Sequence, residues 1–471
     1  MDDKSIRGKD PSYSNKKLLA YGIGQTSDIT AYQTFTFLVF TFYFAVIGVN
    51  VILITLGFII WSIWNSINDP FIGYLSDRTH TKWGRRIPYI MISTIPLALI
   101  TFLLFVPPKT FGITDQITNF VYFLIIIICF ELFFTMYDLN FTALFPELFI
   151  DIKDRAKANL FRQSFLILGL FMAFILPGLF ISDYSDPRSL PQYQIFGIVI
   201  AVVIIIPALI FLKFSPKEKE EFKEDYKGAQ NLFGSIKLCL KSKSFRWYIP
   251  AEVATWFVYG LLPTIMPLYG KFVLGIENTL LLSMLLALTF ISIAIFMNIL
   301  WKPLAERIGP RKSWLISMTI FVVSLVPLMF ITTLIEGIIV FFLIGIGMSG
   351  SIYLIDLIIG DIVDEDEVLT GSRSEGAYYG VNMFLMHLST VFVFLAISLV
   401  FTNVGWAVFE PTKVTPQIIF GLRALMFIFP ALALIIGIIV IYKYPLDGNK
   451  LKELKERLLE IHTEKKLRKS T

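Results

Sequence analysis

Long apolar runs separated by short polar segments extend along the whole of this chain. Many of the runs reach 18 residues or more. A helix needs about 20 such residues to cross a hydrocarbon core that is about 30 Å thick. In that core every backbone N–H and C=O must be paired within the chain, and a helix pairs its own. The pattern therefore predicts an all-α membrane protein.

Twelve runs are long enough to be transmembrane helices. They lie near residues 18–46, 50–75, 88–107, 118–145, 158–182, 193–213, 248–273, 278–300, 312–334, 336–362, 375–402 and 416–443. Several exceed the minimum length, which leaves room for tilt or kinks. The longest interior polar stretch, from Lys213 to Arg246, divides the runs into six and six. It contains the charged segment KEKEEFKEDYKGAQ, which has no apolar face to bury.

This division predicts two six-helix bundles. We expect a cytoplasmic N-terminal tail at 1–17, a bundle at 18–213, a cytoplasmic linker at 214–247, a second bundle at 248–443 and a cytoplasmic tail at 444–471. The tail has the pattern of a basic amphipathic helix, which is more typical of a solvated or membrane-surface helix than of a partner-binding one.

Composition agrees with a lipid environment. The chain is 56% hydrophobic and 16% charged, whereas soluble domains carry about 25% charged residues. Its two cysteines, Cys129 and Cys239, form no disulfide framework or metal-binding spacing. The polar, basic first 17 residues lack the apolar stretch of a cleavable signal peptide, so we expect the first span to act as an uncleaved insertion signal.

Basic residues predict the orientation. If both termini lie on one side, that side has 35 Lys and Arg residues and the opposite side has four. Short cytoplasmic loops carry the excess of Lys and Arg in membrane proteins, so both termini are expected to be cytoplasmic, in a cell membrane. The same bias explains the net charge of +5 without nucleic-acid binding.

Nine ionisable residues fall inside the predicted spans. A charged residue at the centre of a span costs about 2.5–3.5 kcal/mol on insertion scales and usually faces a cavity or pathway. Together they favour a bundle with a polar interior over a dry one. They are Asp28, Asp69, Glu131, Asp138, Arg162, Glu252, Asp356, His387 and Arg423.

The second span carries the most suggestive group. Asn65 and Asp69 are four residues apart and share a helix face, and Pro70 deprives the helix of one backbone hydrogen bond there. A carboxylate with an amide oxygen and freed carbonyls could bind Na⁺, and a carboxylate alone could bind H⁺. His387 is a second candidate, because its charge can change near neutral pH, although a neutral histidine can also simply bridge two helices.

An acid–Arg pair beside a glycine and a basic cluster follows both the second and the eighth span. Such internal repeats occur in transporters that rock one half against the other. The echo and the six-plus-six count favour the major facilitator architecture. We expect Asp77 and Arg78, with Arg85 and Arg86, to brace the inner ends of the spans in the outward-facing state; the alternative is that these basic loops serve topology alone. Glu306 and Arg307 are placed with them as gating residues.

Four segments resemble the glycoside–pentoside–hexuronide:cation symporters, the family of melibiose permease. The first is WNSINDPFIGYLSDRTHTKWGRRIPY, from Trp64 to Tyr89, and the second is DLNFTALFPELFIDIKDRAKANLFRQ, from Asp138 onward. GDIVDEDE at 360–367 and RSEGAYYG at 373–380 complete the set, and the similarity runs from Tyr21 to about the twelfth span.

The resemblance implies roles for matching residues. Asp69 corresponds to a carboxylate of the cation site, Asp138 to an acid between cation and sugar, and Arg162 to an arginine near the sugar. Gln25 and Tyr32 lie on the stretch that lines the cavity. We also place Asn382 with the substrate-binding residues and Glu375 with the gating residues.

The chain departs from the family pattern at several positions. Asn65 stands where the family usually has its first aspartate of span 2, and His387 stands where span 11 often has lysine. Thr142 replaces the aromatic residue on which melibiose permease stacks its sugar, which puts galactosides in doubt. Asp28 lies one residue before that permease's acid in span 1.

The resemblance therefore implies alternating-access symport of a sugar or glycoside, with no cofactor beyond the co-transported ion. The loss of a carboxylate at Asn65 favours H⁺ over Na⁺, with Asp69 and Asp138 as the Na⁺ alternative. An uncoupled facilitator and a lysophospholipid symporter remain open. An enzyme is disfavoured because the chain has no catalytic or metal-binding constellation, and a receptor is disfavoured because the linker and the tail are too small for a folded soluble domain. ATP is not expected to be the energy source, because the chain has no phosphate-binding GxxxxGK[ST] loop. We expect a monomer.

Overall fold

The computed structural model describes residues 13–79, 81–149, 152–217, 237, 239–371 and 375–470. Over these residues the chain is almost entirely helical, and the β pairing is an isolated bridge between Thr81 and Gly84. Within the described ranges, eleven helical stretches are long and apolar enough to cross a membrane, and Ile87–Leu103 is a shorter apolar helix. The predicted all-α membrane fold is confirmed.

The chain divides into two compact units. Unit 1 comprises the described parts of residues 1–42, 67–182 and 186–228, and unit 2 comprises those of residues 43–66, 183–185 and 229–471. The division falls inside one long helix, between residues 66 and 67. The domain limits expected from the sequence therefore stay a prediction, and each unit is described by itself.

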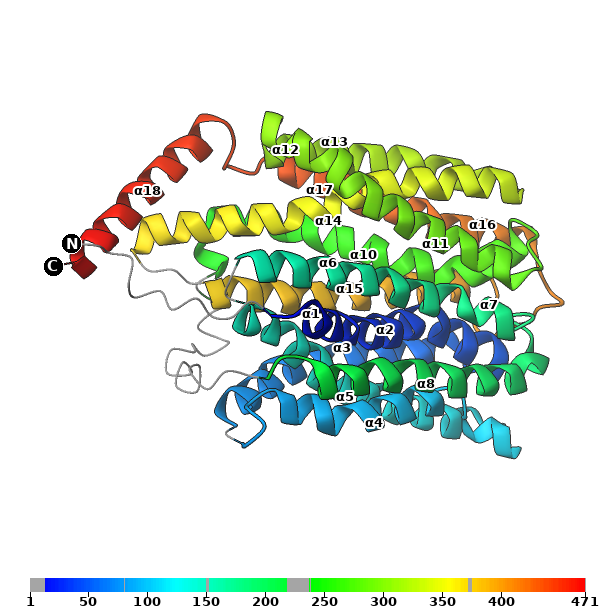
Figure 1. Cartoon of the computed structure of the whole chain (residues 1–471). Coiled ribbons are helices and arrows are strands. Elements are labelled where there is room, and N and C mark those ends of the chain that lie inside the picture. The colour runs from blue at the N-terminus through cyan, green and yellow to red at the C-terminus, as the bar shows by residue number, and fades with distance from the viewer. Residues whose placement is uncertain are drawn as a thin grey trace. The chain divides into compact units, whose positions relative to one another are not determined.

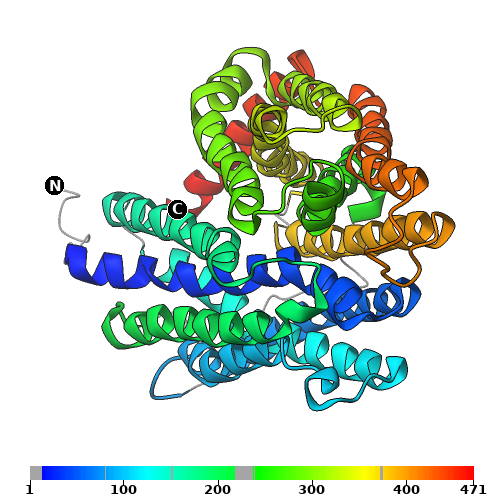
Figure 2. The ribbon, with the colours of Figure 1, turned by 90° about the vertical axis from the view of Figure 1, so that its right-hand side faces the viewer.

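Unit 1 is built from the first helices of the chain. They are α1 (Asn15–Gly22), α2 (Gly24–Thr41), residues 67–78 of α3 (Val51–Arg78), α4 (Ile87–Leu103), α5 (Gln116–Leu148), α6 (Ile152–Phe174), α7 (Leu176–Phe180) and α8 (Leu190–Phe214). Helices α1 and α2 lie beside α6 (Figures 1 and 2), and α4 packs against α5 and α8.

Unit 2 contains residues 51–66 of α3 and the remaining helices. They are α10 (Lys243–Phe272), α11 (Thr279–Phe296), α12 (Lys302–Ile308), α13 (Pro310–Leu325), α14 (Leu334–Thr370), α15 (Glu375–Asn403), α16 (Pro416–Met426), α17 (Ile428–Tyr442) and α18 (Asn449–Ser470). Helix α14 packs against α11 and α13, and α10 packs against α15 and α17 (Figure 1).

Local sequence signals fix where several helices begin. Ser242 caps α10, Asn278 caps α11, and Thr333 caps α14 in a capping box with Glu336. These side chains accept hydrogen bonds from backbone N–H groups that have no partner inside the helix. Pro70 lies inside α3, as the sequence indicated, so the helix lacks one backbone donor next to Asp69.

Glycines allow the closest helix contacts in unit 1. A methyl group added at Gly22 would lie 2.9 Å from the backbone carbonyl carbon of Phe161 on α6. One added at Gly169 would lie 3.0 Å from Ile29 on α2. Small residues that let two backbones approach are a common device in membrane helix packing. The close packing of α1 and α2 against α6 therefore depends on having glycine at these two positions.

A similar device joins the helices of unit 2. A methyl group at Gly347 of α14 would lie 2.5 Å from the Phe321 backbone on α13, and one at Gly350 would lie equally close to the ring of Trp301. The Trp301 Nε1–H donates to the carbonyl oxygen of Ile346 and to Ser349, each at 2.9 Å.

The C-terminal helix α18 contacts the end of α14. Lys455 Nζ lies 2.6 Å from Asp361 Oδ1 and 2.6 Å from Asp364 Oδ2, and His462 Nε2 lies 3.1 Å from the buried Glu367. Burial alone would lower the pKa of Lys455, but the two carboxylates raise it above its usual range. The basic tail therefore has specific acidic partners within unit 2.

Gly22→Ala should destabilise the protein by about 1–3 kcal/mol, because the added carbon overlaps the backbone of α6 and forces the two helices apart. Thermal unfolding of the purified protein in detergent measures the effect. Gly73→Ala is the matched control, since a methyl group there meets nothing nearer than 3.9 Å. Equal melting temperatures for the two variants would contradict the argument.

Candidate substrate and cation site

Asp69 of α3 is held by a hydroxyl group from α5 in unit 1. Thr135 Oγ1 lies 2.9 Å from Asp69 Oδ1 and 3.4 Å from Glu131 Oε1, so the threonine can donate to either carboxyl group. Asn68 Nδ2 donates to the backbone oxygen of Glu131 at 3.3 Å. Glu131 and Thr135, one turn apart on α5, therefore face residues 68 and 69 of α3.

A second polar chain links α2 to α6. Arg162 Nε donates to Gln25 Oε1 at 2.5 Å, and Gln25 Nε2 donates to Asp28 Oδ2 at 2.5 Å. Gln25 and Asp28 are buried, with 2% and 4% of their surface exposed. The Gln25 side chain thus connects the Arg162 guanidinium group to the Asp28 carboxyl group through two hydrogen bonds.

Asp138 connects these two groups. The negative charge of Asp69 acts on the Asp138 carboxyl group, which is also hydrogen-bonded to Asp28, and the positive charge of Arg162 acts on both Asp28 and Asp138. Thr142, one turn further along α5, donates to Asp138 Oδ1 at 3.2 Å. The structure therefore brings together Asp28, Asp69, Asp138 and Arg162 of the predicted site in unit 1, with Gln25 and Thr142 as neutral partners.

Tyr32 lies one turn beyond Asp28 on α2. Its ring stacks on that of Phe134 of α5, with 5.1 Å between ring centres. This contact places two aromatic rings on α2 and α5, the helices that carry Asp28 and Asp138.

Asn65 and His387, which both depart from the family pattern, are in contact in unit 2. Asn65 Nδ2 donates to His387 Nδ1 at 3.0 Å, and Ser62 Oγ donates to the backbone oxygen of His387 at 2.8 Å. Because Nδ1 accepts, a neutral His387 ring carries its proton on Nε2. Asn65 is fully buried, and its Oδ1 has no hydrogen-bond partner among the described residues.

The remaining predicted substrate residue lies elsewhere in unit 2. Asn382 of α15 lies near the buried Glu252 of α10. Among the described residues, no group of three or more His, Cys, Asp and Glu side chains is arranged to hold a metal ion.

The predicted bracing residues have different surroundings. Arg85 and Arg86 converge on one carboxylate, Glu147 Oε1, at 2.7 and 2.8 Å, and all three side chains are nearly buried. Arg78 lies over the ring of Tyr74, 3.9 Å from its centre. Glu306 and Arg307 are exposed. The side chains of Asp77 and Glu375 lie outside the described part of the structure.

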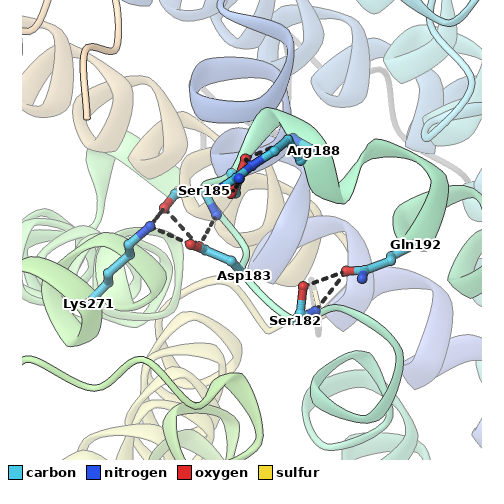
Figure 3. A network of polar contacts seen from close by, with 7 residues as sticks. Ser182, Asp183, Ser185, Arg188, Gln192 and Lys271 are labelled. Carbon is cyan, nitrogen blue, oxygen red and sulfur yellow. Dashed lines mark hydrogen bonds and ion pairs between the residues drawn. The ribbon is translucent and has the colours of Figure 1, made fainter. Parts of the chain in front are cut away.

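A further polar network fixes the short segment 183–185 in unit 2 (Figure 3). Lys271 Nζ, at the end of α10, lies 2.5 Å from Asp183 Oδ2 and 2.8 Å from Ser185 Oγ. The hydroxyl groups of Tyr184 and Ser283 are 2.6 Å apart, and burial raises the pKa of Tyr184 above its usual range. The segment is thus tied to both α10 and α11.

Comparison with known proteins decides the family. Residues 20–448 match the family described as MFS/sugar transport protein, which is most of the chain. The chain belongs to this family. It is therefore a transporter with several membrane-spanning helices and not an enzyme. The resemblance drawn from the four sequence motifs is confirmed.

Three transport proteins are similar to the chain over most of its length. It is 23% identical to the uncharacterized symporter sll1374 of Synechocystis, over 93% of this chain and 96% of that protein. It is 24% identical to the isoprimeverose transporter of Lactiplantibacillus pentosus, over 72% and 70%. It is 22% identical to the mouse sodium-dependent lysophosphatidylcholine symporter 1, over 85% and 80%.

Solved structures agree on the fold. The nucleoside transporter NupG superposes with a TM-score of 0.63 at 14% identity, covering 91% of this chain and 99% of that one. A bacterial homologue of the iron transporter ferroportin, in an inward-facing state, gives 0.64 at 15% identity, covering 92% and 99%. The twelve-helix major facilitator architecture predicted from the sequence is confirmed at the level of the fold.

Sequence reasoning missed two residues that the structure brings to these sites. Glu147 lies in the PEL segment that carried the resemblance, but a lone acid near the end of a span gives no sign of its partners. Thr135 lies four residues after Glu131 and three before Asp138. That spacing puts it on the same face of α5 and could have identified it.

Glu147→Gln should destabilise the protein by about 3 kcal/mol, because it leaves two nearly buried guanidinium groups without their shared anion. Thermal unfolding in detergent measures the loss. The matched control is Glu410→Gln, which breaks an exposed pair with Lys413 and should change stability by less than about 0.5 kcal/mol. If both variants unfold at the wild-type temperature, Arg85 and Arg86 do not depend on Glu147.

His387→Lys should destabilise the protein by about 3 kcal/mol, since the lysine that the family often has here would bury a charge beside the neutral Asn65. Adding Asn65→Asp supplies the missing anion and should recover most of the loss. Thermal unfolding of the two single variants and the double variant gives the coupling between the positions. Additive effects would mean that the two departures are independent.

Proposed function

We propose that this protein is a secondary active transporter that carries a sugar or glycoside together with H⁺ by alternating access. The observation that carries the proposal is the cluster of Asp28, Asp69, Asp138 and Arg162 in unit 1. Such a cluster inside membrane helices is costly unless it binds something or takes up protons. Membership of the MFS/sugar transport protein family supports the sugar.

Asp69 is the proposed coupling residue. It matches a cation-site carboxylate of the glycoside–pentoside–hexuronide:cation symporters, and Thr135 donates a hydrogen bond to it. Protonation of Asp69 would remove its repulsion with Asp138, so a bound proton would change how the cluster accepts substrate. Asp138, Gln25 and Arg162 would hold the hydroxyl groups of the sugar, with Tyr32 and Thr142 nearby.

The partner of Asn65 supports H⁺ rather than Na⁺. Its amide donates to His387 and so adds no anion one turn before Asp69. Na⁺ is bound best by several oxygen atoms, including carboxylates. A site with fewer anionic oxygens suits a proton, which needs a single carboxylate. Na⁺ bound near Asp69 and Asp138 is the alternative that the experiment below separates.

An apolar groove in unit 2 supports a different substrate class. A cavity of about 480 Å³ lies between α10, α15 and α17, with a wholly apolar set of side chains that includes Val253, Phe257, Phe392 and Phe429. An acyl chain would fit such a lining, and the mouse relative is named for lysophosphatidylcholine. A lysophospholipid is therefore the second candidate substrate.

The proposed location is the cell membrane, with both termini in the cytoplasm and the protein acting as a monomer. The positive charge of the loops on the terminal side supports this orientation.

The test is uptake of a panel of labelled sugars into proteoliposomes, with H⁺ and Na⁺ gradients imposed separately. We expect accumulation of a sugar driven by H⁺ alone. Accumulation driven by Na⁺ would keep the symporter and discard the argument from Asn65. Equilibration without accumulation would identify a facilitator. If no sugar enters, lysophospholipids are tested next.

Asp69→Asn should abolish gradient-driven accumulation, because the amide binds no proton. Sugar exchange without a gradient should persist, because the amide still accepts a hydrogen bond from Thr135. Asp115→Asn is the matched control, since Asp115 is exposed and caps the start of α5. Accumulation at the wild-type level in Asp69→Asn would remove Asp69 from the mechanism.

A further inference from the structure

Glu252 is a buried acid in the middle of a helix of unit 2, far along the chain from the acids of unit 1. It lies in α10 and has no exposed surface. Neither of its carboxyl oxygens has a hydrogen-bond partner of regular geometry among the described residues, and no ion pair is found for it there. The proposed coupling through Asp69 makes no use of this residue.

Polar groups surround the carboxyl group without neutralising it. Tyr248 and Trp256 lie four residues before and after Glu252, on the same face of α10, and Asn382 lies on the facing helix α15. All three are close enough to act on the charge of Glu252. The Tyr248 hydroxyl, the Trp256 Nε1–H and the Asn382 Oδ1 are themselves buried and lack regular hydrogen bonds within the described chain.

The charged group that acts on Glu252 is another acid. Asp356 of α14 repels a negative charge on Glu252, and the Tyr248 hydroxyl is the neighbouring titratable group on α10. A buried carboxylate with a like charge nearby and no counter-charge among the described residues is destabilised. A protonated carboxyl group therefore fits these surroundings better than an ionised one.

We propose that Glu252 is a second proton-binding group of the transport cycle, in addition to Asp69. The carboxylate takes one H⁺ from water when its surroundings are hydrated, becomes a carboxylic acid when they close, and returns the H⁺ when they are hydrated again. The inference rests on the proposed H⁺-coupled function and adds a second H⁺ per cycle.

Steady-state accumulation tests the stoichiometry. Each coupled H⁺ allows about tenfold accumulation of a neutral sugar for a gradient of one pH unit. Two protons therefore allow about 100-fold accumulation, and Glu252→Gln should reduce this to about tenfold while sugar exchange continues. Glutamine has the shape of the neutral acid, and Glu277→Gln, at an exposed position before α11, is the matched control. Unchanged accumulation in Glu252→Gln overturns the proposal.

Infrared difference spectroscopy of the purified protein gives a readout that needs no transport. The C=O band of a buried carboxylic acid should disappear in Glu252→Gln, remain in Glu277→Gln, and shift in Tyr248→Phe. It should lose intensity when the pH is raised. A missing band, or one that stays constant at every pH, overturns the proposal. If the wild type shows no gradient-driven uptake, the proposed function fails, and the pH response of this band still decides whether Glu252 exchanges a proton.

Discussion

The structure depends on one constraint, which is that a polar group in the hydrocarbon region must be paired or neutral. The backbone meets it by folding into helices, and the side chains meet it in different ways. Arg85 and Arg86 share the carboxylate of Glu147, and Arg162 reaches Asp28 through the amide of Gln25. Thr135 donates to Asp69. Glu252 has neutral polar neighbours but no counter-charge among the described residues, so a protonated carboxyl group is the form that meets the constraint.

The same constraint explains why two departures from the family pattern occur together. A lysine at position 387 would need an anion within reach, and an aspartate at position 65 would need a cation. The side chains of asparagine and histidine meet the need with a hydrogen bond between them. Changing one member alone would leave a buried charge without its partner, which costs more than the pair contributes. The constraint therefore applies to these two positions as a pair rather than to each one alone.

The sequence predicted the membrane helices well, because an apolar run of 18 or more residues has few other stable forms in lipid. It also identified most of the acids in the cluster, because a charge inside such a run is conspicuous by its cost. It could not predict which of them meet. Asn65 and His387 are 322 residues apart, and Asp28 lies on a helix, α2, whose close packing against α6 depends on Gly169. Nor could it predict that Asn382, which was grouped with the substrate-binding residues, lies near Glu252 of α10.

The two acids assigned to protons differ in a way that suits different steps of one cycle. Asp69 has a hydroxyl donor and two neighbouring carboxyl groups, so its charge state sets the charge of a whole cluster that includes Arg162. Glu252 is surrounded by a phenol, an indole and an amide, which can donate or accept hydrogen bonds but cannot supply a charge. Its ionised form is therefore stable only when water reaches it. Asp69 therefore responds to what binds at the cluster, whereas Glu252 responds to hydration. Alternating access changes both binding and hydration.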